Sequence, residues 1–150
     1  VYLQHYIERD ELWTTDDLAG ASLWGPPGNW SPSLRETLQL AKVICAPSII
    51  WRAPLVASGV IRAELMHPKQ PLHYHLAVLG AEPSMQGRGI GSALLRPVLE
   101  QCDHDGIGAY LESSKEENIA FYARHGFRVT RYLDLPRGPR VHMMWRDPQN

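Results

Sequence analysis

A glycine-rich turn between a predicted strand and a predicted helix is the strongest constraint on what this chain can fold into. Glycine occupies every second position of the run Gln86-Gly87-Arg88-Gly89-Ile90-Gly91. Residues 72–79, just before it, have few polar positions, which predicts a central strand. The apolar spacing from about Gly89 to Asp103 predicts a helix. Glycines at a helix start let backbone N–H groups approach a ligand closely, and a phosphate suits that position.

The spacing of these glycines differs from that of two familiar phosphate-binding motifs. The Walker motif needs a lysine after the glycines, and none follows here. The dinucleotide motif G-x-G-x-x-G needs a third glycine where Ser92 or Leu94 stands. The pattern Q-x-x-G-x-G fits, and Arg88 adds a positive side chain. We expect the backbone of this turn to hold a pyrophosphate. A glycine-rich turn without a ligand would have the same pattern. The residues expected to bind are Gln86, Gly87, Arg88, Gly89, Ile90, Gly91 and Ser92.

The rest of the chain alternates strand-like and helix-like segments, which predicts one α/β or α+β domain over residues 1–150. Further strands are expected at 11–15, 19–24 and 109–113, and a hairpin at 128–135 and 141–146. Further helices are expected at 33–45, at 54–66 and from Ser114, because Ser114 to Glu117 has the form of a capping box. Gly126 is expected to be the C′ residue of that last helix, and Gly80 to mark a bulge or a close approach of the backbone.

Composition argues against several classes of protein. The net charge is −1, so nucleic-acid binding through bulk positive charge is not expected. No apolar run approaches the length of about 18 residues that a membrane span needs. Cys45 and Cys102 have no zinc-site spacing, and we expect two buried, free thiols in a cytoplasmic protein.

The second half of the chain resembles the GNAT superfamily of acetyl-CoA-dependent N-acetyltransferases. Residues 79–83 followed by the glycine-rich turn are similar to that family's fourth strand, its bulge and its pyrophosphate loop. The run from Asn118 to Phe127 resembles the family's N-x-x-F-Y-x-x-x-G-F signature. Residues 110–114 and the Gly138-Pro139 turn look most like puromycin N-acetyltransferase and its relatives.

This resemblance implies the GNAT fold, an α/β arrangement in which helices flank a mixed, mostly antiparallel sheet. The sheet is splayed between the family's fourth and fifth strands. Family members usually have a strand and two helices before the hairpin that we expect at residues 11–24. We therefore expect a single N-acetyltransferase domain that is short or truncated at its N-terminal end.

The resemblance also implies roles for individual residues, with acetyl-CoA as co-substrate. The backbone of Leu79 and Ala81 would meet the pantetheine arm, and Asn118 would contact the cofactor. Tyr122 would donate a proton to the departing CoA thiolate. The plainer alternatives are a core aromatic residue for Tyr122 and a surface amide for Asn118.

A base is needed as well, because a primary amine is an ammonium at neutral pH. Glu112 is the first candidate, since a carboxylate in an apolar strand can have its pKa raised toward a useful value. His75, His73 and a chain of water molecules are the rivals. The His73-x-His75 pair lacks an evident third ligand, so no metal is expected.

The function expected from the sequence is transfer of an acetyl group to a primary amine of a small molecule or peptide, by direct attack in a ternary complex. The alternatives are a non-catalytic acyl-CoA sensor and an acyltransferase that uses another acyl-CoA. The sequence does not name the acceptor amine. An exposed edge of the sheet could also pair two copies in a homodimer.

Overall fold

The computed structural model describes residues 12–28 and 53–149, without the side chains of 53–57 and 60. The predicted helix at 33–45 lies outside these residues. None of the helices within them is long and apolar enough to cross a membrane. The elements in chain order are β1 (Leu12–Thr14), β2 (Gly20–Gly25), α3 (Ala53–Met66), β3 (His73–Ala81), the 3-10 helix η2 (Pro83–Met85), α4 (Ile90–Asp105), β4 (Gly108–Ser113), α5 (Glu117–Ala123), β5 (Arg128–Asp134) and β6 (Arg140–Arg146).

One parallel pair of strands lies at the centre of an otherwise antiparallel sheet. The six described strands have the order β1-β2-β3-β4-β6-β5. β3 and β4 run parallel, and every other neighbouring pair is antiparallel. The chain crosses from β3 to β4 through α4, as a parallel connection requires. The predicted mixed, mostly antiparallel sheet is confirmed.

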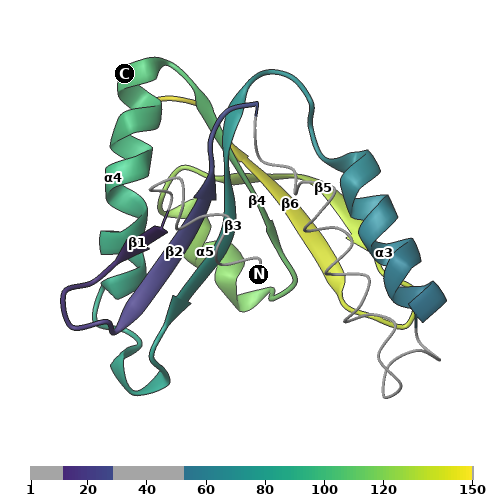
Figure 1. Ribbon diagram of the computed structural model, residues 1–150, viewed down its shortest axis with the longest axis horizontal. Coiled ribbons are helices and arrows are strands. Elements are labelled where there is room, and N and C mark those ends of the chain that lie inside the picture. Colours follow the sequence, from purple (N-terminus) through teal and green to yellow (C-terminus); the bar gives the residue numbers. More distant parts are fainter. Residues whose placement is uncertain (1–11, 29–52, 150) are drawn as a thin grey trace.

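The parallel pair separates halfway along β3. The two strands pair from His73–Gly108 to Leu76–Leu111, whereas β3 continues to Ala81. Figure 1 shows the two ribbons diverging beyond the paired part. The splay predicted between these strands is confirmed, and it leaves the last five residues of β3, 77–81, facing an opening instead of β4.

A bulge in β3 coincides with this separation. In the ladder with β2, Leu76 and Val78 have partners and Ala77 between them does not. An extra residue in one strand bends it and increases its twist, so the bulge turns β3 away from β4. The bulge expected at Gly80 is therefore wrong in position, because Gly80 pairs regularly with Ala21.

The helices cover opposite faces of the sheet (Figure 1). The larger core lies under α4 and α5; its buried members include Leu76, Leu95, Leu99, Cys102, Leu111, Tyr122 and Met144. The smaller core lies under α3; Ala63 and Met66 of that helix pack against its buried members Tyr110, Leu133 and Met143. Because neighbouring strand residues point to opposite faces, Leu111 belongs to one core while Tyr110 and Glu112 point to the other. Cys102 is a buried, free thiol as predicted, whereas Cys45 lies outside the described residues.

The two ends of α5 test two predictions. Gly126 has a φ of +85°. Its N–H donates to the carbonyl of Ala123, and the N–H of Phe127 donates to Tyr122. This pair of bonds is the Schellman motif, so Gly126 is confirmed as the C′ residue.

The predicted capping box is wrong. The helix begins at Glu117 after Glu116, and no side chain caps it. The hydroxyl of Ser113, not Ser114, bonds to the backbone of Lys115, because Ser113 ends β4 and turns inward while Ser114 is exposed. This local bond gives the chain a turn before the helix can start.

A buried arginine ties the end of the sheet to both helices of the larger core. The Arg146 side chain is 3% exposed. Its two terminal nitrogens donate to the two carboxylate oxygens of Asp103 at 2.7 Å, and its Nε donates to the carbonyl of His125 at 2.9 Å. The planar guanidinium thereby joins β6, α4 and the turn after α5.

We predict that Arg146→Lys lowers the free energy of unfolding by about 1–3 kcal/mol, because lysine keeps the charge but lacks the planar fork that reaches both partners. The matched control is Arg140→Lys, which changes an exposed pair with Asp134 and should cost about 0.5 kcal/mol or less. Urea denaturation at pH 7 measures both. Equal losses in the two variants would contradict the role given to Arg146.

Candidate active site

A cleft of about 740 Å³ lies where the end of β3, the glycine-rich turn and α5 meet. It gathers the predicted cofactor-binding residues other than Arg88, which is exposed, and it includes Tyr122. The predicted residues that line it are Leu79, Ala81, Gln86, Gly87, Gly89, Ile90, Gly91, Ser92, Asn118 and Tyr122. Segments that are distant in sequence thus form one surface.

The glycines of the turn serve different purposes. Gly87 and Gly89 have φ values of +78° and +83°, and Gly89 is the N-cap of α4. The N–H of Ala93 makes the first helical bond, to the carbonyl of Gly89. The N–H groups of the turn before Ala93 therefore point out of the helix toward the cleft. Gly91 has a steric role, because a Cβ there would lie 3.0 Å from the ring of Phe121.

Two positive side chains at the cleft were missed by the sequence reasoning. Lys115 and Arg124 line it, before and after the helix that carries Asn118 and Tyr122. Their position beside the already predicted signature was the signal that could have found them. The N–H of Gln86, by contrast, makes a bond of 3.4 Å to Pro83 within η2, so it is less available to a ligand than was expected.

Tyr122 lines the cleft from α5. Asn118 and Tyr122 are one helical turn apart on α5, and both line the cleft. Tyr122 is only 8% exposed. Burial raises the pKa of its phenol, so the hydroxyl keeps its proton at neutral pH. The residue is both a core aromatic and a cleft residue, so the two interpretations of it are compatible.

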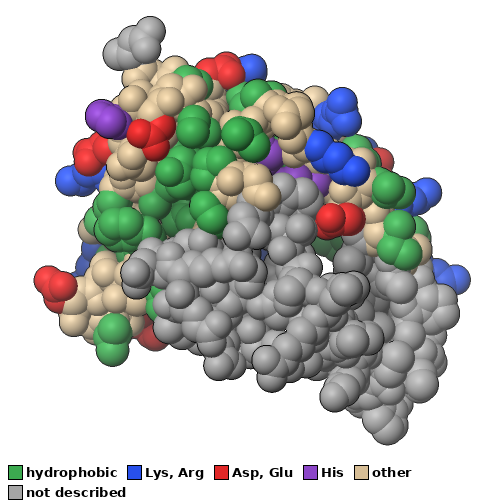
Figure 2. Space-filling model, turned by 45° about the horizontal axis from the view of Figure 1, so that its top comes forward, with side chains coloured by type: hydrophobic (Ala, Val, Ile, Leu, Met, Phe, Trp, Pro, Cys, Tyr) green, Lys and Arg blue, Asp and Glu red, His purple; other side chains and the backbone are tan. Residues whose placement is uncertain are grey.

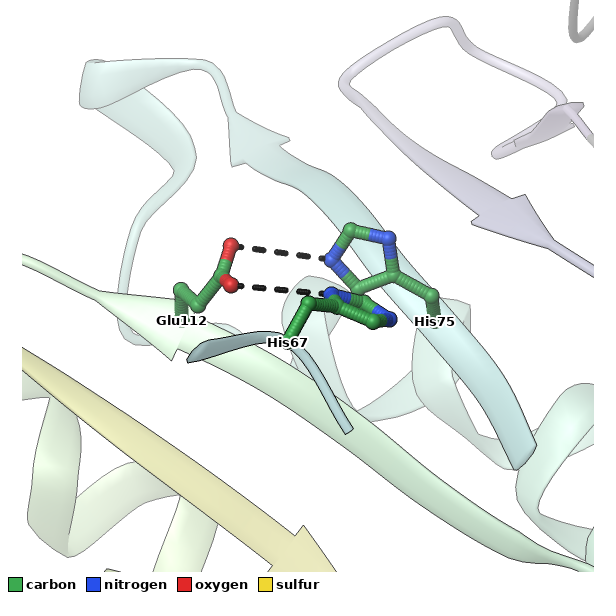
Figure 3. Close-up of side chains that lie close together, drawn as sticks. All are labelled: His67, His75 and Glu112. Carbon is green, nitrogen blue, oxygen red and sulfur yellow. Dashed lines mark ion pairs between the residues drawn. The ribbon is translucent and has the colours of Figure 1, made fainter. Parts of the chain in front are cut away.

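Glu112 lies on the other face of the sheet, in a cluster with two histidines. Figure 3 shows its carboxylate facing the rings of His67 and His75, with one oxygen directed at each ring. Oε1 is 3.7 Å from Nδ1 of His67, and Oε2 is 3.8 Å from Nε2 of His75. The Tyr110 hydroxyl donates to Oε1 at 2.9 Å. On the face drawn in Figure 2, histidine side chains gather between a hydrophobic area and several basic side chains.

The electrostatics of Glu112 differ from the expectation. Burial by itself opposes ionisation, but the imidazoles of His67 and His75 and the Tyr110 hydroxyl hold the pKa of Glu112 well below its usual range. The expected upward shift is therefore wrong in direction. Burial also lowers the pKa of His67, so this imidazole is neutral at pH 7. The cluster thus consists of a carboxylate that stays charged and a neutral ring beside it.

Glu112 and the cleft residues of β3 both follow the place where the two strands separate. Leu111 is the last residue of β4 that pairs with β3, and Glu112 follows it directly. Leu79 and Ala81, on the unpaired part of β3, line the cleft on the α4 side.

The sequence showed no evident third metal ligand for the His73-x-His75 pair. The structure brings His67 and Glu112 close to His75. Ligand atoms of His67, His75 and Glu112 lie within 4.8 Å of one another, close enough to be considered for a metal ion. Zinc ligands at 2.0–2.2 Å in a tetrahedron are about 3.3–3.6 Å apart. The observed spacing is wider, and Oε1 already accepts the Tyr110 proton. We therefore interpret the cluster as an acid–base group and not as a metal shell.

Comparison with known proteins agrees with this geometry. The acetyltransferase (GNAT) family matches residues 30–127, so the chain belongs to that family. An uncharacterised N-acetyltransferase of Schizosaccharomyces pombe is 27% identical over 154 aligned residues, which cover 96% of this chain and 62% of that protein. The chain thus spans less than two thirds of that relative's length.

Two solved structures are similar over nearly the whole chain. The histone acetyltransferase HPA2 and related acetyltransferase of Corynebacterium glutamicum has a TM-score of 0.66 at 21% identity and covers 99% of this chain and 74% of its own. Arylalkylamine N-acetyltransferase 2 of Aedes aegypti has a TM-score of 0.61 at 13% identity, with coverages of 97% and 78%. These likenesses confirm the GNAT fold. The closer relation to puromycin N-acetyltransferase stays a prediction.

The position of Glu112 predicts a pH-dependent contribution to stability. A carboxyl group whose pKa is lower in the folded than in the unfolded chain stabilises the fold above the unfolded pKa of about 4.3. That stabilisation is lost as the pH falls toward the folded pKa. We predict that Glu112→Gln is less stable than the wild type at pH 7, and that the difference shrinks between pH 5 and pH 3.

Urea denaturation at a series of pH values measures this difference. Glu100→Gln, on the exposed side of α4, is the control for loss of a carboxylate outside the cluster and should change stability by about 0.5 kcal/mol or less at pH 7. A Glu112→Gln difference that is constant with pH would contradict the low pKa of Glu112.

Proposed function

We propose that the protein is an acetyl-CoA-dependent N-acetyltransferase that acts on a primary amine of a small molecule or peptide. The observation that supports this most is the cleft itself. It combines the start of α4, the unpaired edge of β3 and the hydroxyl-bearing Tyr122 in one continuous surface. Membership of the acetyltransferase family implies acyl transfer from an acyl-CoA.

The cofactor would lie along the cleft. Backbone N–H groups at the start of α4 suit the pyrophosphate, because the helix end carries partial positive charge and unpaired donors. Lys115 and Arg124 add full positive charges for phosphate groups. The backbone of Leu79 and Ala81 would pair with the pantetheine arm as a neighbouring strand does. Asn118 would contact the arm from α5.

The reaction needs an acid on the cleft side and a base on the amine side. Tyr122 would protonate the CoA thiolate as the C–S bond breaks. The CoA thiol has a pKa near that of Cys, about 8.5, so the thiolate is a fair leaving group even before proton transfer is complete. Glu112 would attract the acceptor ammonium through its negative charge from the α3 face. Glu112, His75 or a water molecule would then remove the proton. No metal ion is part of this proposal.

The rival within the same fold is a protein that binds acyl-CoA without turnover, or one that uses another acyl group. Release of free thiol from acetyl-CoA separates these possibilities. The assay would use a panel of acceptor amines that contains arylalkylamines, polyamines, amino acids and short peptides. Release of free thiol in the presence of an amine would support the proposal. A protein that binds CoA but releases no thiol with any amine of the panel would be an acyl-CoA sensor. Faster release from a longer acyl-CoA would assign a different acyl donor.

We predict that Gly89→Ala weakens CoA binding at least tenfold while the protein stays folded. The substitution puts a Cβ in the cleft where the pyrophosphate would lie, and forces a side chain into a positive φ. Gly106→Ala is the matched control, because Gly106 caps the other end of α4 with a φ of +66° and equally open surroundings. Both should lose about 1–2 kcal/mol of stability. Calorimetry that shows equal CoA affinities would refute the placement of the pyrophosphate.

We also predict that Tyr122→Phe lowers kcat by about 10- to 1000-fold with little change in CoA affinity, because only the hydroxyl is lost. Tyr132→Phe is the control, since that hydroxyl belongs to an exposed side chain of β5. Steady-state thiol release and calorimetry give the two quantities. Full activity in Tyr122→Phe would assign the proton to water or to another residue.

A further inference from the structure

A second pocket lies on the α3 side of the sheet and is separate from the cleft described above. It has a volume of about 410 Å³ and is bounded by the end of α3, the segment up to Pro71 and the strands β4, β5 and β6 (Figure 1). None of the described residues that line it also lines the cleft. Small-molecule sites have volumes of roughly 300–1000 Å³, so this α3 pocket is large enough for one small ligand.

Apolar and aromatic side chains form much of the α3 pocket. They come from the end of α3, the segment after it and the sheet; they are Met66, Pro68, Pro71, Tyr110, Met143 and Trp145. Two of these side chains are flat aromatic rings carried by neighbouring strands, opposite each other in the ladder of β4 and β6. Aromatic rings prefer stacked or edge-to-face contact with another ring, so an aromatic ligand suits this surface.

A bulge in β5 brings two arginines to the same side of the sheet. In the ladder with β6, Arg128 pairs with Trp145 and Arg131 pairs with Met143. The residue between them without a partner is Thr130. Regular alternation would place Arg131 on the opposite face from Arg128, because the two are three positions apart. The extra residue returns Arg131 to the α3 side, and both arginines line the α3 pocket.

The two arginines differ in how their charges are balanced. Nη1 of Arg128 donates to Asp147 at 2.5 Å, and the same carboxylate accepts a bond of 2.7 Å from Nε1 of Trp145. Among the described residues, Arg131 makes no ion pair. Burial raises the pKa of Tyr110, and the charge of Arg131 opposes that rise. The α3 pocket therefore has one uncompensated guanidinium, close enough to Tyr110 to act on its hydroxyl.

The charge across the α3 pocket is positive at one edge and negative at the other. Glu112 on β4 and Arg131 on β5 are both opposite Met143 of β6, so the three form one row across the sheet. The Tyr110 hydroxyl donates to Glu112 at 2.9 Å, and that carboxylate stays ionised because its pKa is lowered. An anion is therefore repelled from the β4 edge and attracted to the β5 edge.

We propose that the α3 pocket binds an aromatic monocarboxylate, with the ring against Tyr110 and Trp145 and the carboxylate on Arg131. The planar guanidinium presents two parallel N–H donors to the two oxygens of a carboxylate. One uncompensated positive charge matches one negative charge on the ligand. The proposal does not rest on the function proposed above, since none of the residues that carry it lines the cleft.

The four methionines of the chain report on the two sites separately. Met66 and Met143 line the α3 pocket, Met85 lines the cleft, and Met144 is buried in the larger core. The first test is a titration with indole-3-acetate of protein labelled with ¹³C in its methionine methyl groups. We expect saturable shifts of Met66 and Met143 with a Kd of about 1 mM, and an unchanged Met85. No saturable shift of Met66 and Met143, or a shift of Met85 alone, would overturn the proposal.

Two further probes separate the contributions of the ring and the carboxylate. Indole-3-acetamide has the same shape without the charge, and we expect it to bind about tenfold more weakly. Acetate has the charge without the ring, and we expect no saturable shift at the same concentrations. Equal binding of the acid and the amide would overturn recognition of the carboxylate. Equal binding of acetate would overturn the role of the aromatic surface.

Arg131→Gln tests the residue that would hold the carboxylate. Its side chain is exposed, so the variant should stay folded. We expect the affinity for indole-3-acetate to fall about 5- to 20-fold. Arg140→Gln is the matched control, because it makes the same change of charge at an exposed position of β6 outside the α3 pocket. Equal affinities in the two variants would overturn the proposal.

Asp147→Asn should have the opposite effect. It removes the counter-ion of Arg128 and leaves two positive charges at the β5 edge, so the affinity for indole-3-acetate should rise about 2- to 5-fold. Asp134→Asn, which frees Arg140 instead, is the control and should leave the affinity unchanged. Equal affinities in these two variants would show that the carboxylate does not lie at the β5 edge. Met66 and Met143 signals that change when the free protein is diluted would also overturn the proposal, because a second copy would then occupy the α3 pocket.

Discussion

The site depends on the place where β3 stops pairing with β4. Up to Leu76 and Leu111 the two strands form an ordinary parallel ladder, and beyond that point the bulge at Ala77 bends β3 away. Parallel strands whose backbone groups are all paired would leave no room for a ligand within the sheet. The separation leaves an unpaired strand edge in the cleft.

On the two faces of the sheet, burial acts together with different neighbouring groups, so the pKa shifts have opposite directions. On the α4 side, burial raises the pKa of Tyr122, because nothing compensates the charge that a phenolate would carry. On the α3 side, burial also opposes the charge of Glu112, but two imidazoles and a hydroxyl outweigh it and the pKa is lowered. One face therefore holds a protonated phenol, and the other holds a negatively charged carboxylate.

The rigid parts of the structure surround this opening without closing it. Arg146 joins the end of β6 to the C-terminal part of α4 and to the turn after α5, so the two helices of the larger core are held to the sheet. The Schellman motif at Gly126 fixes the end of the helix that carries Tyr122. Gly91 lets α4 approach Phe121 closely, which keeps the glycine-rich turn and α5 on the same cleft.

Local patterns determined much of this protein from sequence alone. The glycine-rich turn, the spacing of Asn118 and Tyr122 and the glycine at position 126 each depend on residues a few positions apart, so they could be predicted, and with them the cleft. The start of α5 was predicted wrongly, because Ser113 and Ser114 offer competing local bonds and only the inward turn at the end of β4 selects between them.

Only the tertiary structure decided the chemistry on the α3 face. The direction of the Glu112 shift depends on His67 and His75, which lie 45 and 37 positions away in the sequence (112 − 67 and 112 − 75). His67 stands at the end of a helix with no pattern that marks it. It also makes a hydrogen bond with His73 across a turn, and no spacing rule predicts such a bond. Electrostatic effects depend on distances in space, and these exist only once the sheet and α3 have packed together.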